Sequence, residues 1–250
     1  MDKWKFYDIT HKRHVLCNPM SLGKLDRLIR LIELPPEAKV IEIAMGKGEF
    51  ILRLAESYGV SGIGIDISPH CIADAEGKRS ARTPGARLTF KEMDGAKFTP
   101  EAAESYDLAA CIGASWIYGG HKQTLEALSR MAAPDGWVVV GEPFWLQEAP
   151  APYLEAIGVN ADAFGTHADN VATAEGLGLQ LVHALAGNTD DWDQYEGLKW
   201  HAVDAYARSH SDDPDLPEVV RRVAEEKTAY LNWGRDTLGW AIYLFRRPAR

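Results

Sequence analysis

The sequence predicts an α/β fold: a doubly wound, mostly parallel sheet of seven strands whose last strand is antiparallel, with a helical cap inserted before that strand. Short apolar runs alternate with stretches of helical periodicity along most of the 250 residues, which is typical of a parallel sheet covered by helices. A glycine-rich turn follows the first apolar run, as in nucleotide-binding domains. A long helix-like insertion precedes the last run, and it predicts the cap.

The elements of the first half follow from local signals. Ser21 is a good N-cap, and apolar residues recur after it at helical spacing until Pro35 and Pro36 stop the helix. Ser68 and Pro69 supply an N-cap and a proline at the first helical position. The expected strands of this half are 39–44, 62–66, 87–92 and 106–112, with one face of a helix marked over 50–58.

The second half continues the alternation and adds two long segments. Its expected elements are a helix at 121–131, a strand at 136–143, a helix near 168–177, and strands at 179–186 and 240–246. Residues 144–167 and 187–238 exceed what the alternation needs, and the second segment contains helix-like stretches at about 192–208 and 216–232. Both segments should roof the carboxyl edge of the sheet, where open α/β sheets bind ligands. We therefore expect an N-terminal helical segment of residues 1–34, a core of 35–186 and 239–250, and a cap of 187–238 to which 144–167 contributes.

Composition limits the function classes. The formal net charge is −9, from 36 acidic and 27 basic residues, and the absence of a basic block disfavours a nucleic-acid partner. Cys17, Cys71 and Cys111 lie far apart without a CxxC pair, so no metal site is expected. The first residues lack the apolar run of a signal peptide, and no apolar run is long enough for a membrane span. We expect a cytoplasmic protein without a membrane partner; the sequence does not indicate an oligomeric state.

The stretch EIAMGKGEF, residues 42–50, joins the first strand to the next helix. Gly46 and Gly48 allow the backbone to approach a ligand closely. Glu42 ends the first strand and Asp66 ends the second. In this arrangement Asp66 can accept hydrogen bonds from both ribose hydroxyls of an adenosine, and Glu42 can meet an amino-acid ammonium. Ala44 stands where such loops carry their first glycine, and a positive φ there would cost on the order of 1–2 kcal/mol.

Other nucleotide motifs fit less well. A dinucleotide motif needs a third glycine where this chain has Ile51, whose bulk opposes close packing of helix on strand. A G-x-x-x-x-G-K-[ST] loop is absent, because the lysine beside these glycines, Lys47, lies between them. An NAD-dependent oxidoreductase on a Rossmann-like fold is thus an alternative, not the leading interpretation.

The ends of four strands resemble the motifs of class I S-adenosylmethionine-dependent methyltransferases: VIEIAMGKGEF, GIGIDIS, EMDGA and DLAACIGASW. The resemblance implies S-adenosylmethionine as cofactor, S-adenosylhomocysteine as product and no metal. In that family Asp94 would cap the adenine amino group beside Gly95 and Ala96, and the backbone at Cys111–Gly113 would pass near the methionine moiety. The implied cofactor residues are Glu42, Ala44, Gly46, Gly48, Asp66, Ile67, Asp94, Gly95, Ala96, Cys111 and Gly113.

A second, narrower resemblance covers nearly the whole chain. CIGASWIYGG, VVGEPFW, DWDQYEGLKW and GWAIYLFRR are similar to motifs of a bacterial subgroup of uncharacterised methyltransferases of the small-molecule type. The resemblance implies methyl transfer to a small molecule bound under the cap. A non-catalytic module that only binds S-adenosylmethionine is a further alternative, and Ala44 is its only support.

Aromatic residues are the candidates for binding the acceptor. Trp116 and Trp145 follow the fourth and fifth strands directly, while Tyr195, Trp200 and Trp233 lie in the expected cap. Together they predict a pocket for an apolar or cationic acceptor. Packing within the cap explains at least half of them equally well.

The candidate catalytic residues carry a weaker signal, because methyl transfer depends mainly on positioning. Glu142 ends the fifth strand, where a carboxylate can orient or deprotonate an acceptor, although a loop hydrogen bond explains it equally well. His121 begins the helix after IYGG, where a surface histidine is the simpler explanation. His11 and His14 lie in an N-terminal segment that carries a turn signal at residues 18–19 and could fold over the cofactor, although exposure to solvent is the simpler expectation for both histidines.

Overall fold

The computed structural model describes residues 1–101 and 105–249, and the strands within them form one seven-stranded sheet in the order β3-β2-β1-β4-β5-β7-β6. β1 to β5 pair in parallel, and β7 runs antiparallel between β5 and β6. The predicted fold class is confirmed. The strands are β1 (Lys39–Ile43), β2 (Ser61–Asp66), β3 (Leu88–Glu92), β4 (Tyr106–Ile112), β5 (Ala132–Trp145), β6 (Gln180–Ala186) and β7 (Leu238–Arg246).

Helices cover both faces of the sheet, which is why its central strands are apolar on both sides. α2 (Leu22–Leu31), α3 (Glu49–Tyr58) and α4 (Pro69–Arg82) pack on one face, against residues such as Val40 and Leu108. α5 (His121–Met131) and α7 (His167–Gly176) pack on the other, against residues such as Ile43 and Val140.

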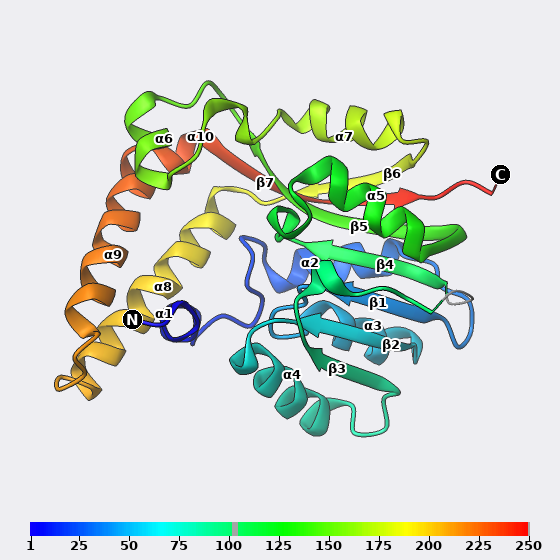
Figure 1. The fold of residues 1–250 in the computed structure, drawn as a ribbon, viewed down its shortest axis with the longest axis horizontal. Helices are drawn as coiled ribbons and strands as arrows, with labels where there is room; N and C mark the ends of the chain where they lie inside the picture. The colour runs from blue at the N-terminus through cyan, green and yellow to red at the C-terminus, as the bar shows by residue number, and fades with distance from the viewer. Residues whose placement is uncertain (102–104, 250) are drawn as a thin grey trace.

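A group of helices lies beyond the carboxyl ends of the parallel strands β1 to β5, on the side away from the β7 arrowhead in Figure 1. It comprises α1 (Lys3–Thr10), α6 (Ala151–Ile157), α8 (Thr189–Ser209), α9 (Leu216–Ala229) and α10 (Arg235–Thr237). A π-helical turn, Tyr230–Gly234, continues α9 into α10. The division into core and cap stays a prediction. Residue 250, the last residue of the expected core, lies outside the part of the chain that the structure describes.

The N-terminal helix α1 was not marked by apolar periodicity, and it folds against the C-terminal half of the chain. Ile9 packs with Val203 of α8 and Val219 of α9. The Lys5 ammonium binds two carboxylates of the α8–α9 loop region, Asp213 at 2.8 Å and Asp215 at 2.7 Å. This docking carries the following residues, 11–20, back toward the sheet.

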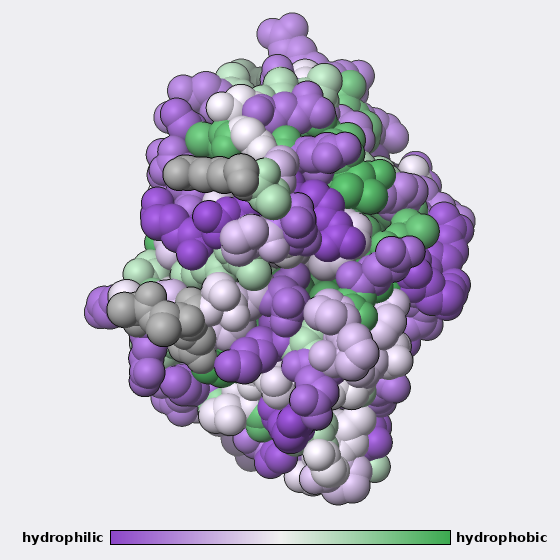
Figure 2. Space-filling view, turned by 90° about the vertical axis from the view of Figure 1, so that its right-hand side faces the viewer, coloured by the Kyte–Doolittle hydropathy of each residue, from purple (hydrophilic) through white to green (hydrophobic). Residues whose placement is uncertain are grey.

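The opposite end of the molecule is formed by the amino ends of the parallel strands and the loops around them. Figure 2 shows it covered mostly by hydrophilic residues, with hydrophobic ones in separate groups. Among the residues that the structure describes, no helix combines the length and the apolar character needed to cross a bilayer.

Candidate functional site

A cavity of about 400 Å³ lies at the carboxyl ends of β1, β2 and β4. Most of the expected cofactor residues line it: Glu42, Ala44, Gly46, Asp66, Ile67, Asp94, Gly95 and Gly113. Gly48, Ala96 and Cys111 do not line it; the Cys111 side chain is fully buried within the sheet. The motifs that are far apart in sequence thus meet at one cavity.

The loop after β1 is held in an unusual conformation. Ala44, Gly46 and Gly48 have φ values of +53°, +54° and +68°. Ala44 therefore has the left-handed backbone conformation, which costs a residue with a Cβ atom on the order of 1–2 kcal/mol. At Gly48 a Cβ atom would also lie 3.1 Å from the Cβ of Ala75, so this glycine permits close packing of α3 on α4.

Two carboxylates of the cavity also organise its backbone. Asp66 accepts hydrogen bonds from the Gly46 N–H at 2.8 Å and from the Ser68 N–H at 2.9 Å. Burial raises the pKa of Asp66, and these backbone bonds oppose the rise. Glu42 accepts from the Ile51 N–H at 3.1 Å, and burial raises the pKa of Glu42 to about 8.

Exposed apolar side chains that a ligand can contact form part of the cavity wall. Ile67 is 45% exposed and Trp116 is 73% exposed, although both are large hydrophobic side chains. Asp94 accepts from the Ala96 N–H at 3.0 Å, and the Tyr118 hydroxyl donates to the Gly95 carbonyl at 3.2 Å. The Tyr118 contact joins the 3₁₀ turn Gly95–Lys97 to the turn Ser115–Tyr118 that carries Trp116. An apolar slot flanked by carboxylates fits an adenosyl group with an amino-acid tail.

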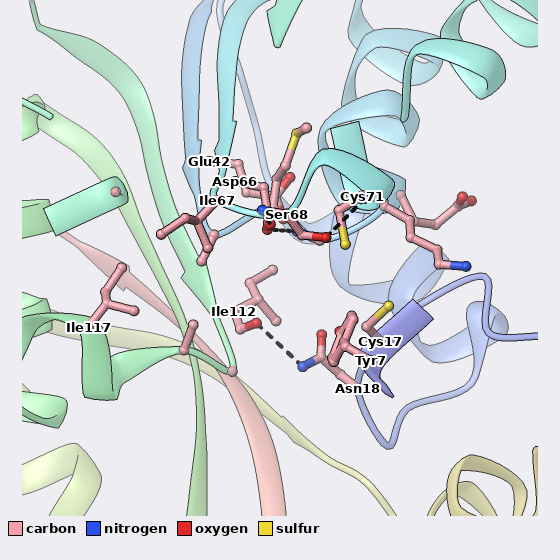
Figure 3. Close-up of a pocket in the computed structure, with 18 of the residues that line it drawn as sticks. Tyr7, Cys17, Asn18, Glu42, Asp66, Ile67, Ser68, Cys71, Ile112 and Ile117 are labelled. Carbon is pink, nitrogen blue, oxygen red and sulfur yellow. Dashed lines mark hydrogen bonds between the residues drawn. The ribbon is translucent and has the colours of Figure 1, made fainter. Parts of the chain in front are cut away.

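Residues of the N-terminal segment close the cavity, and they were not among the expected cofactor residues. Figure 3 shows Tyr7, Cys17 and Asn18 on the side facing Asp66 and Ile67. The Asn18 side-chain amide donates to the carbonyl of Ile112, at the end of β4, at 3.3 Å. The sequence signal was limited to a turn at residues 18–19, which says nothing about long-range contacts.

The prediction that His11 and His14 are exposed was wrong, since both are buried. His11 Nε2 lies 2.9 Å from the hydroxyl of Tyr195, and His14 Nε2 lies 2.9 Å from the Tyr195 carbonyl. Burial lowers the pKa of His14 to about 4 and also lowers that of His11. The two neutral rings therefore join the N-terminal segment to α8.

Glu142 and His121 lie together behind the cavity and do not line it. Glu142 is buried, and its Oε1 accepts from the Ser115 hydroxyl at 2.9 Å. Its Oε2 lies 3.7 Å from His121 Nδ1, and neither of these two atoms has a hydrogen-bond partner among the residues that the structure describes. The other ring nitrogen of His121 bonds to the carbonyl of Asn170 at 3.0 Å.

The five expected acceptor aromatics are divided by the fold. Trp116 lines the cofactor cavity, and Tyr195 lines a neighbouring one. Trp145 packs edge-on against Phe164, and its indole donates to a backbone carbonyl at 2.9 Å. Trp200 packs near Tyr230 within the cap, and Trp233 borders an outer groove beside α6 and α9.

No group of three or more potential ligands among the described residues is arranged to hold a metal ion.

Comparison with known proteins agrees with this geometry. Residues 40–136 match the family model described as a methyltransferase domain. The uncharacterised protein YjhP of Escherichia coli is 30% identical over 247 residues, which span 97% of this chain and 98% of YjhP. A dTDP-3-amino-3,6-dideoxy-alpha-D-glucopyranose N,N-dimethyltransferase of Streptomyces fradiae is 28% identical over 74% of this chain and 71% of its own.

A solved structure extends the match to the bound nucleotide. The S-adenosylmethionine-dependent methyltransferase of Thiobacillus denitrificans, in complex with S-adenosylhomocysteine, superposes with a TM-score of 0.90. It is 30% identical, and the match covers 100% of both chains. Fold and site thus define a nucleotide-binding α/β enzyme. The chain belongs to the class I S-adenosylmethionine-dependent methyltransferases, and S-adenosylmethionine is its cofactor. The comparisons favour neither the oxidoreductase nor the non-catalytic module.

Proposed function

We propose that the protein transfers the methyl group of S-adenosylmethionine to a small-molecule acceptor held under the helices at the carboxyl edge. The observation that supports this most is a second cavity, of about 470 Å³, beside the cofactor cavity. Val15, Leu16 and Asn18 line both cavities, while Tyr195 and Leu198 of α8 line the second. Its volume is that of a small-molecule site.

The proposed roles follow from the placement of the side chains. S-adenosylmethionine supplies an electrophilic methyl group with a neutral leaving group, so the chain mainly has to hold the cofactor, orient the acceptor and exclude water. Asp66 and Asp94 would bind the adenosyl part, and Glu42 the ammonium. Trp116 and Tyr195 are the expected aromatics whose cavities an acceptor can reach. Catalytic roles for Glu142 and His121 remain predictions.

An amine is the acceptor class to test first, because the Streptomyces relative is an amino-sugar N,N-dimethyltransferase. The net charge of −9 agrees with a small acceptor rather than a nucleic acid. The proposal includes a cytoplasmic location and no membrane partner.

Label transfer tests the proposal directly. The protein is incubated with S-adenosylmethionine carrying a tritiated methyl group and with the small-molecule, protein and nucleic-acid fractions of a bacterial extract. We expect label in the small-molecule fraction. Label confined to protein or nucleic acid would contradict the proposal.

A cavity-filling pair tests the place of the acceptor. Leu198→Trp should reduce label transfer while the affinity for S-adenosylhomocysteine is kept, because Leu198 lines the second cavity and does not line the cofactor cavity. Ala224→Trp is the matched control, since Ala224 lines the outer groove beside α6 and α9. Equal transfer by both variants would exclude the second cavity as the acceptor site.

A further inference from the structure

Residues 11–18 belong to no helix or strand, and the last four of them, 15–18, line the cofactor cavity. Residues 11–18 are defined here as the strap. Backbone hydrogen bonds of regular structure do not fix the strap, so side-chain contacts must hold it in place. These contacts come from the glycine loop and α4 on one side, and from β4 and α8 on the other.

Two lysines bind backbone carbonyls of the strap. Lys47 Nζ donates to the His11 carbonyl at 3.0 Å, and Lys78 Nζ donates to the Val15 carbonyl at 3.0 Å. Lys47 stands between Gly46 and Gly48, within the loop that lines the cavity. The strap is thus attached to the part of the chain that meets the cofactor.

The lysines are linked to each other and to acidic partners. Lys47 pairs with Asp74 at 2.8 Å, and Lys78 pairs with Glu49 at 3.0 Å and donates to the Lys47 carbonyl at 3.2 Å. Lys47 is only 7% exposed. A buried ammonium is tolerated only when its hydrogen bonds are satisfied, so the His11 carbonyl is part of what makes this position stable.

The opposite edge of the strap contacts the acceptor side. Asn18 donates to the Ile112 carbonyl at 3.3 Å, and His11 and His14 contact Tyr195 of α8 at 2.9 Å each. Figure 3 shows the Asn18 contact at the cavity wall. The strap therefore joins the cofactor loop to the helix that borders the second cavity.

We propose that Lys47 and Lys78 are positioning residues that hold the strap against the cofactor cavity, so that cofactor affinity and strap closure depend on each other. A ligand that orders the glycine loop fixes Lys47 where it reaches the His11 carbonyl, and a closed strap stabilises the loop in return. This inference does not depend on which acceptor is methylated.

Trypsin reports strap opening without any cofactor, because Lys12 and Arg13 are exposed residues of the strap. In ligand-free Lys47→Met and Lys78→Met, cleavage after these two residues should be about tenfold faster, the scale of one lost hydrogen bond to a charged group. S-adenosylhomocysteine should protect the wild type, and its affinity for either variant should fall by a similar factor. Lys39→Met is the control, because Lys39 is exposed at the start of β1.

A double-mutant cycle separates closure of the strap from general loss of structure. If Lys47 and Asn18 act through the same closed strap, the effects of Lys47→Met and Asn18→Ala on affinity will be less than additive. If Lys47→Met does not fold, Lys78→Met gives the same test, because Lys78 is less buried. Cleavage at the wild-type rate in a folded variant, or strictly additive effects, would overturn the proposal.

Discussion

Asp66 and Gly46 are joined by a hydrogen bond of 2.8 Å, from the backbone N–H of the glycine to a carboxylate oxygen of the aspartate. The residue expected to bind the ribose therefore also fixes the loop expected to approach the cofactor. Because each carboxylate oxygen has more than one lone pair, Asp66 can keep its backbone bonds and still accept from a ligand.

Replacing Asp66 should affect both functions. Asp66→Ala should weaken S-adenosylhomocysteine binding by about 100-fold, since two hydrogen bonds to a charged acceptor are lost. It should also lower the melting temperature, because the backbone N–H groups of Gly46 and Ser68 lose their acceptor. Glu92→Ala is the control: Glu92 pairs with Asp66 across β2 and β3 but is exposed. Unchanged affinity in Asp66→Ala would remove the assigned role.

Ala44→Gly should stabilise the protein, because φ at this position is +53°. The expected gain is about 1 kcal/mol, or roughly 2–4 °C in Tm for a chain of this size. Glu37→Gly is a matched control, since Glu37 has φ +60° in an exposed turn away from the cavity. Thermal unfolding should show a gain for both variants, but only Ala44→Gly should also tighten cofactor binding. An unchanged Tm for Ala44→Gly would show that the loop relaxes around the alanine.

Glu42 should make stability depend on pH. Its pKa is about 8 in the folded protein against 4.5 ordinarily, so the folded state keeps a proton that the unfolded chain releases. The free energy of unfolding of the cofactor-free protein should therefore fall as pH rises between these two pKa values, from 4.5 to about 8. Glu42→Gln should show a smaller pH dependence when unfolding is measured across it.

Cofactor binding should depend on pH in the opposite direction. A ligand ammonium favours the ionised form of Glu42, so affinity should increase as pH rises toward 8, with release of a proton below that value. Calorimetry in two buffers with different ionisation enthalpies measures this proton directly. Equal heats in both buffers at pH 7 would contradict the assignment of Glu42 to the ammonium.

Glu142→Gln tests the predicted catalytic role. If Glu142 removes a proton from the acceptor, kcat should fall by about 100-fold. The affinity for S-adenosylhomocysteine should be kept, because a glutamine carbonyl can still accept from the Ser115 hydroxyl. Ser115→Ala removes that contact alone and serves as the comparison. An unchanged kcat in Glu142→Gln would show that Glu142 only holds the turn that carries Trp116.

The cofactor side of the cavity could be predicted from the sequence because its signals are local. Glu42, Gly46 and Asp66 stand at strand ends, and the parallel topology brings strand ends to one edge. The antiparallel last strand was part of the predicted fold class, whereas the order of the strands in the sheet was not predicted. β5 extends beyond the expected 136–143 at both ends, because Ala132 pairs with β4 and residues 144–145 pair with β7.

The N-terminal wall could not be predicted, since its contacts join residues far apart in the chain. His11 and Tyr195 are separated by 184 positions, and although Tyr195 lies in the DWDQYEGLKW motif, that motif does not indicate a contact with His11. The surroundings of the aromatic side chains could not be predicted for the same reason. Their positions in the sequence indicated that Trp145, Trp200 and Trp233 lie near the carboxyl edge, but packing decides which side chains face a cavity.

The most direct test of the central claim is a calorimetric titration of the purified protein with S-adenosylhomocysteine, with NAD as the comparison ligand. We predict micromolar binding of S-adenosylhomocysteine and no binding heat from NAD, because the cavity offers carboxylates and an apolar slot to one adenosyl group. Binding of NAD without binding of S-adenosylhomocysteine would contradict the account.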